Sequence, residues 1–189
     1  DYAIDNAYYS SILVYSVINI ILAVSLNLVI GLAGQFSMGH AGFMAVGAYA
    51  SAFTSLQLQP YLLAHGYNSA VFETIAFMGA LYVGGLVAAF FGYVVGLPSL
   101  RLKGDYLAIV TLGFGEIIRV MILNIETVGG ARGLPGIPKY TNLGWCTFVA
   151  LLCILLMRRL KHSSHGRAIL AVREDEIAAE AMGVNTTSY

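Results

Sequence analysis

The sequence contains few charged residues. Its 189 residues include 10 Lys or Arg and 10 Asp or Glu, and none of these four types occurs between Asp5 and Glu73. A charged side chain at the centre of a bilayer costs about 2.5 to 3.5 kcal/mol on insertion scales, so membrane-embedded segments are depleted of charge. Charged residues make up 11% of this chain, far below the roughly 25% of soluble domains. The composition therefore excludes an ordinary soluble domain and predicts a membrane protein.

Short motifs that bind nucleotides or metals are also missing. The loop Gly-x-x-x-x-Gly-Lys-Ser/Thr is absent, because none of Lys103, Lys139 and Lys161 follows glycine or precedes Ser or Thr. The histidines and cysteines do not pair at metal-ligand spacing, apart from two histidines in a basic tail. Within the apolar segments Ser37 and His40 form a nearby nucleophile and base pair, and no acid stands beside them. We therefore expect no catalytic residue, metal or cofactor in this chain, no ATP hydrolysis of its own, and no nucleic-acid partner.

What the sequence does contain is a series of long apolar runs. A membrane span needs about 20 apolar residues, and four clear candidates are residues 9–32, 70–97, 106–125 and 143–157. Residues 36–56 are less hydrophobic and form either a fifth span or a re-entrant segment. The four prolines are expected between these segments, where they remove no helical hydrogen bond; they are Pro60, Pro98, Pro135 and Pro138.

These runs predict an all-α, polytopic transmembrane helix bundle with about five spans, or four spans plus a re-entrant segment. Residues 1–157 would form the transmembrane core, and residues 158–189 a cytoplasmic loop. Positive residues in short loops stay in the cytoplasm, and this loop contains Arg158, Arg159, Lys161, Arg167 and Arg173. Counting back through alternating spans places Arg101 and Lys103 inside and residues 56–68 outside. Arg132 and Lys139 oppose this orientation, because they lie in a loop predicted to be outside. The basic residues in the predicted inner loops outnumber them.

Small residues recur every four positions in the third apolar run. They are Ala80, Gly84, Ala88, Gly92 and Gly96. Such a stripe lets the backbone of a neighbouring helix approach closely, so it predicts a helix–helix contact. A ligand path along the stripe is the alternative.

Glu116, Arg119 and His40 are ionisable residues inside apolar segments. Glu116 and Arg119 fall well within residues 106–125, and their i, i+3 spacing predicts a buried, mutually neutralised pair on one helix face. The pair either orients its helix or forms a functional site, which is the default for intramembrane charges. His40 could cap a helix or contact a substrate, but we favour a hydrogen bond to a backbone carbonyl.

After the last apolar run the chain becomes charged. Glu174, Asp175 and Glu176 suit the positive first turn of a helix, and the alanines that follow are strong helix formers. Gly183 is expected just past the helix end. The sequence therefore predicts a short helix over residues 174–182, which either docks on a partner or lies solvated at the surface.

Three runs in this order resemble the branched-chain amino acid ABC transporter permeases of the LivM type. They are LNLVIGLAGQFSMGHAGF (26–43), RLKGDYLAIVTLGFGEIIR (101–119) and GRAILAVREDEIAAEAMG (166–183). The resemblance implies a multi-pass permease subunit in the bacterial inner membrane. It also implies a second, LivH-type permease, two separate ATPase subunits and a periplasmic amino-acid-binding protein as partners.

The resemblance assigns roles to two groups of residues. The expected ATPase-coupling residues are Arg173, Glu174, Asp175, Glu176, Ala178, Ala179 and Gly183. The expected residues of a translocation path or of helix packing are Gln35, Ser37, Gly39, His40, Gly42, Glu116 and Arg119.

The chain departs from the family pattern in two respects. The coupling motif of ABC importers reads Glu-Ala-Ala-x-x-x-Gly, but Ile177 occupies its Glu position, so the charge does not carry over. The family continues with further spans beyond residue 189, so we expect a fragment of a larger permease. A secondary transporter or channel subunit, with Glu116 as an ion or proton site, is the alternative function. Urea and amides are alternative substrates within the wider group.

Overall fold

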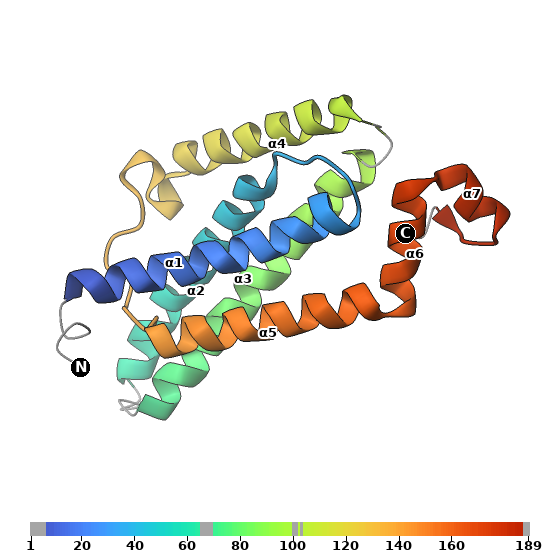
Figure 1. Cartoon of the computed structure of the whole chain (residues 1–189). Helices are drawn as coiled ribbons and strands as arrows, with labels where there is room; N and C mark the ends of the chain where they lie inside the picture. Colours follow the sequence, from blue (N-terminus) through green and yellow to red (C-terminus); the bar gives the residue numbers. More distant parts are fainter. Residues whose placement is uncertain (1–6, 65–69, 100–101, 103, 187–189) are drawn as a thin grey trace. The chain divides into compact units, whose positions relative to one another are not determined.

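The computed structural model of the protein describes residues 7–64, 70–99, 102 and 104–186. Its long helices follow the apolar runs of the sequence (Figure 1). They are α1 (Ala7–Asn27), α2 (His40–Ala64), α3 (Ala70–Ser99), α4 (Asp105–Asn124) and α5 (Leu143–His162), followed by the shorter α6 (Ser164–Glu174) and α7 (Glu176–Ala181). A π-helical turn, η1 (Leu28–Leu32), extends α1, and two 3₁₀ turns, η2 (Glu126–Val128) and η3 (Gly130–Arg132), follow α4. These described residues contain no strand, which confirms the predicted all-α class.

Four helices are long and apolar enough to cross a membrane. They cover Tyr8–Leu32, Phe72–Ser99, Tyr106–Asn124 and Leu143–His162, and they confirm the four clear spans. The less hydrophobic segment forms α2, whose 25 residues would extend about 38 Å at 1.5 Å per residue. Its length therefore suffices for a crossing.

Two prolines lie inside helices, where the sequence predicted none. Pro60 falls within α2 and Pro98 within the last turn of α3. Both helices continue beyond the end of the apolar run. The sequence prediction placed the helix ends where the apolar run ends, and so it placed them too early. Proline in a helix interior removes one backbone hydrogen bond, a loss that neighbouring helices and hydroxyl side chains can offset in membrane spans.

The chain forms two compact units, residues 1–36 with 141–189 and residues 37–140. In the first unit α1 packs along α5, and η1 contacts α6. The two long helices run in the same direction, because η1, at the end of α1, meets the helix that follows α5 (Figure 1). Parallel neighbours require an odd number of crossings between them. Since α3 and α4 supply two, this arrangement favours a third crossing by α2, which would make five spans among the described residues.

In the second unit α2 packs closely against α3 through small residues. A Cβ added to Gly84 would lie 2.6 Å from the Gly47 carbonyl oxygen, and one added to Gly47 would lie 3.3 Å from the Ala88 Cβ. Ala80 is also buried. The predicted helix contact is therefore confirmed for Ala80, Gly84 and Ala88. It does not extend to Gly92 and Gly96, where an added Cβ would meet nothing within 4 Å among the described residues.

Helix α4 packs on α2 with one face. Leu107, Ala108, Thr111 and Ile118 are buried on it, at the i, i+3/i+4, i+7 spacing of a helix stripe. The start of α2 lies against this stripe, because a Cβ on Gly39 would meet the Thr111 carbonyl oxygen at 2.9 Å and one on Gly42 would meet Gly115 Cα at 3.0 Å. The two helices therefore run parallel at this contact.

Candidate functional site

Helices α6 and α7 form a compact helical pair beyond the end of α5 (Figure 1). Asp175 begins α7, and its Oδ1 accepts hydrogen bonds from the backbone N–H groups of Ile177 (2.9 Å) and Ala178 (3.0 Å). Such capping of free N–H groups stabilises a helix start by about 1 kcal/mol. The structure corrects the predicted start, because Glu174 ends α6 and does not belong to the first turn of α7.

Gly183 ends α7, as the sequence predicted. Its φ of +85° lies in the left-handed region. Its N–H donates to the Glu180 carbonyl and the next N–H, of Val184, to that of Ala179, which is the glycine-dependent Schellman stop. The chain therefore leaves the short helix at a fixed point.

Arg173 connects α6 to the end of α1. Its Nη1 donates to the Gly31 carbonyl oxygen at 2.6 Å, and its Nε and Nη2 donate to Glu174 Oε1. Gly34, with φ of +69°, leaves room for the arginine stem, since a Cβ there would overlap the Arg173 side chain. Arg173 is therefore a structural link between η1 and the α6–α7 pair.

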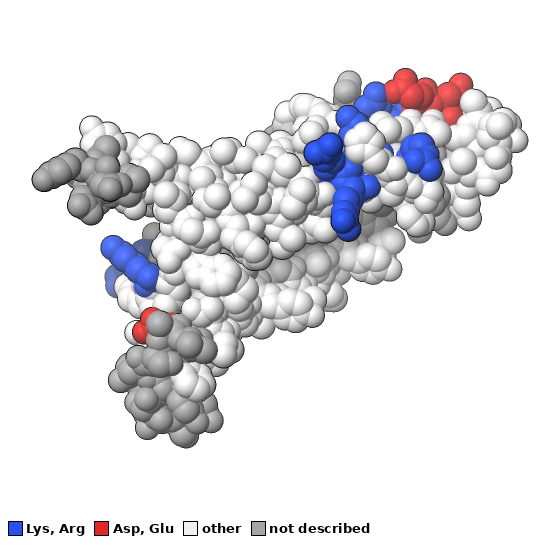
Figure 2. Space-filling model, turned by 60° about the horizontal axis from the view of Figure 1, so that its bottom comes forward, with Lys and Arg blue, Asp and Glu red and all other residues white. Residues whose placement is uncertain are grey.

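The surface of α7 combines acidic and exposed apolar side chains. In Figure 2 the acidic side chains at this end of the first unit gather directly beside basic ones. Ile177 is 81% exposed and Met182 84% exposed, whereas Ala179 is only 4% exposed. Ala179 therefore packs inside the α6–α7 pair, and the apolar surface available to a partner comes from Ile177 and Met182. The sequence had singled out Ala179 and not these two residues.

The predicted path residues divide between the two units. Gln35 follows η1 in the first unit, and its N–H donates to the Val29 carbonyl. Ser37, Gly39, His40 and Gly42 belong to the second unit. Gly39 and Gly42 are buried against α4, while Ser37 and His40 are half-buried.

Thr111 holds the non-helical segment before α2, a role that was not predicted from the sequence. Its Oγ1 accepts the Met38 N–H at 3.1 Å and donates to the Ala108 carbonyl oxygen at 3.0 Å. A buried threonine on an otherwise apolar helix stripe is the signal that could have identified it. Non-helical backbone at membrane depth occurs where it is buried in protein or lines a cavity, so this segment is positioned and not a free loop.

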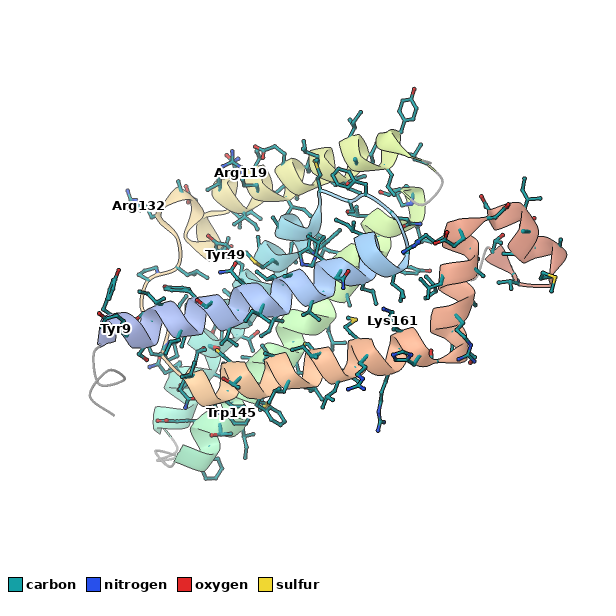
Figure 3. All side chains as sticks on the ribbon, in the orientation of Figure 1. Tyr9, Tyr49, Arg119, Arg132, Trp145 and Lys161 are labelled. Carbon is teal, nitrogen blue, oxygen red and sulfur yellow. The ribbon has the colours of Figure 1, made fainter. Side chains whose placement is uncertain are left out.

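Glu116 and Arg119 form the predicted ion pair on α4. The Arg119 Nη2 lies 2.9 Å from Glu116 Oε1, and its Nε donates to both carboxylate oxygens. The two side chains are 55% and 65% exposed on the surface of the chain, so the pair is not packed against another described helix. Gly115 and Ile118 face α2 instead, so the adjacent Glu116 and Arg119 turn away from it. Figure 3 shows Arg119 pointing outward from α4.

Four long apolar helices, a well-packed small-residue core and a charged helical pair at one end of a unit define a multi-span membrane protein. The chain matches, over residues 8–189, the family described as "Branched-chain amino acid transport system / permease component". It therefore belongs to this family of permease components. No solved structure matches the chain.

Three relatives support the same assignment. The high-affinity branched-chain amino acid transport system permease proteins LivM of Salmonella typhimurium and Escherichia coli are each 40% identical, over 91% and 90% of this chain and 45% of their own length. The probable branched-chain amino acid transport permease protein LivM of Methanocaldococcus jannaschii is 30% identical over 92% of this chain and 59% of its own length. The chain thus spans about half the length of the curated relatives that it matches.

Proposed function

We propose that the chain is part of the permease subunit of an ATP-binding-cassette importer that moves branched-chain amino acids across the bacterial inner membrane. The observation that carries the proposal is the family match over residues 8–189, together with relatives named for this transport. The partners would be a second, LivH-type permease, two ATPase subunits and a periplasmic amino-acid-binding protein. ATP would be hydrolysed on the ATPase subunits.

The α6–α7 pair is the proposed contact with the ATPase. An isolated helix shorter than about 12 residues is marginal in water, and α7 has six residues, so it depends on its cap, its stop and its packing on α6. With the helix held in place, Ile177 and Met182 present exposed apolar side chains. They would fill an apolar groove of the ATPase, which explains how an isoleucine can stand at the motif's Glu position.

Arg173 gives this contact a route to the membrane. Movement of α7 would pull on α6, and the bond from Arg173 to the Gly31 carbonyl would pass that movement to the end of α1. Glu174, bound to the same guanidinium, keeps the arginine oriented. In this proposal Asp175 and Gly183 set the two ends of α7, and Glu176 lies in its first turn. Ala178 lies on the exposed side of α7, and Ala179 holds the helix against α6.

The segment from Gln35 to Gly42 is the proposed border of the translocation path. Support comes from its non-helical backbone before His40 and from its attachment to Thr111 in α4. Discontinuous helices of this kind form substrate sites in many transporters. Glu116 and Arg119 would serve a different purpose: they neutralise each other on the outer face of α4, which favours an interface role over ion transport.

Reconstitution of the full transporter tests the proposal. We expect leucine uptake into proteoliposomes to require ATP and the ATPase subunits, and Ile177→Asp to reduce uptake at least tenfold by placing a charge in the apolar contact. This estimate rests on a buried unpaired charge costing several kcal/mol, where 1.4 kcal/mol is tenfold. Ile177→Leu, which keeps the apolar surface, should retain coupling. Uptake driven by an ion gradient without the ATPase would contradict the proposal.

A further inference from the structure

The first unit contains an open cavity where the chain leaves the apolar part of α1 and α5. Its volume is about 580 Å³, within the range of small-molecule sites. The end of α1, the end of α5 and α6 all contribute to its wall. Its position coincides with the charged end of the first unit, where the predicted orientation puts the cytoplasmic surface of the membrane.

The lining of this cavity changes character along α5. Ile154 and Met157 supply apolar surface toward the middle of the helix, and Leu28 adds to it from η1. Arg158, Lys161 and His162 line the end of the cavity nearest the charged tail. Seven residues from Ile154 to Lys161 correspond to about 10 Å along a helix. The cavity lining therefore changes from apolar to basic within about 10 Å along α5.

The basic part is not neutralised from within the described chain. Arg173 also lines the cavity, but its guanidinium is bound to Glu174 and to the Gly31 carbonyl. No carboxylate lines the cavity among the residues that the structure describes, and the ion pairs found there do not involve Arg158 or Lys161. Figure 3 shows Lys161 at the end of α5 opposite Trp145.

We propose that this cavity binds an anionic phospholipid of the cytoplasmic leaflet, with the phosphate held by Arg158 and Lys161 and the upper acyl chain lying on Leu28, Ile154 and Met157. Basic pockets between transmembrane helices on the cytoplasmic side bind anionic headgroups in this way. An amino acid suits the cavity less well, because its ammonium group would find no carboxylate among the described lining residues. The bound lipid would fill the space between η1 and α6 beside the Arg173 link.

The chain provides matched control positions. Arg159 is the next residue on α5 and has the same charge, but it does not line the cavity. Likewise, Leu155 follows Ile154 on α5 and is apolar, but it does not line the cavity. Ile154 is 42% exposed and Leu155 57% exposed, so tryptophan at either position can be accommodated without a change in the core.

Native mass spectrometry of the full-length permease, purified with its partner subunits, tests the site. Palmitoyl-oleoyl phosphatidylglycerol is titrated against palmitoyl-oleoyl phosphatidylcholine, and inorganic phosphate is added in a separate arm. We expect phosphatidylglycerol to be retained preferentially and Arg158→Gln to weaken its retention about fivefold, from about 1 kcal/mol per cation near an anionic surface. Ile154→Trp should weaken it similarly, whereas Arg159→Gln and Leu155→Trp should leave it unchanged.

Three results would overturn the proposal. Equal losses with Arg158→Gln and Arg159→Gln would indicate general attraction to the charged surface. Equal retention of the two lipids would remove the headgroup requirement. Displacement of phosphatidylglycerol by inorganic phosphate at matched concentration would indicate a simple anion site without a role for the acyl chain.

Discussion

At the residue scale, Glu116 and Arg119 place two charged side chains on an otherwise apolar helix. Two ionised groups lie in the middle of an apolar helix and project away from the rest of the second unit. Each is tolerable there because the other is within hydrogen-bonding distance. In the assembled transporter this face of α4 would meet lipid or a partner subunit, and in either setting the pair has to act as one neutral group.

Removing one member of the pair should therefore be worse than removing both. We expect Glu116→Gln to lower the yield and the thermal stability of the purified permease, because it leaves Arg119 as a lone charge. The double variant Glu116→Gln with Arg119→Met should recover most of both. Fluorescence-detected size-exclusion chromatography after heating measures the difference. If the double variant were as unstable as the single one, a direct role for Glu116 would replace neutralisation.

At the element scale, the contact between α2 and α3 depends on the absence of side chains. Gly47 and Gly84 bring the two backbones together, and membrane helices without a strong hydrophobic drive to associate rely on such close packing. The four-residue period of small residues made this contact predictable from the sequence. Its limit at Gly92 and Gly96 was not predictable, because the period alone does not show where the neighbouring helix diverges.

One added methyl group should separate these two helices. Gly84→Ala would place a Cβ 2.6 Å from the Gly47 carbonyl oxygen, and overpacking of this kind costs about 1 to 3 kcal/mol. Gly85→Ala is the matched control, since nothing described lies within 4 Å of its Cβ position, and it should be neutral or slightly stabilising. Thermal denaturation in detergent measures both. Equal effects of the two variants would rule out a steric origin.

The sequence located the long helices well but gave little information about their faces. Residues 70–97 are apolar all round, so no polar side marks which residues pack inward. Thr111 was overlooked because a threonine in an apolar run is compatible with both packing and lipid exposure. Ala178 and Ala179 are chemically identical and differ only by 100° of helix rotation, yet one is exposed and the other buried. Such distinctions depend on where α6 lies, which composition does not encode.

At the scale of the whole molecule, the parallel arrangement of α1 and α5 requires an odd number of membrane crossings between them. If α2, α3 and α4 all cross, the positive-inside prediction places the start of α5 on the outer side and α6 in the cytoplasm. Two positions that bear on the orientation prediction, Lys103 and His65, lie outside the described residues. Positions in the described loops and helices are therefore better places for probes.

Cysteine labelling tests this orientation. In a variant with Cys146 and Cys153 replaced by alanine, we expect a cysteine at Lys139 to react with an impermeant maleimide in intact spheroplasts. A cysteine at Ser164 should react only after the membrane is opened, because it follows the end of α5 that is predicted to face the cytoplasm. Reaction of Ser164→Cys in intact spheroplasts, or protection of Lys139→Cys in them, would reverse the map.

The pairing of α1 with α5 also determines when the first unit can form during synthesis. Roughly 115 residues separate the two helices, which at 5 to 20 residues per second corresponds to about 6 to 23 s of translation. During that interval α1 resides in the bilayer without its neighbour. It has the highest mean hydropathy of the four apolar helices, 2.3 against 1.8 for α5. A high hydropathy suits a helix that is surrounded by lipid before its neighbour is made. The first unit can therefore close only late, when the ribosome has already completed the second.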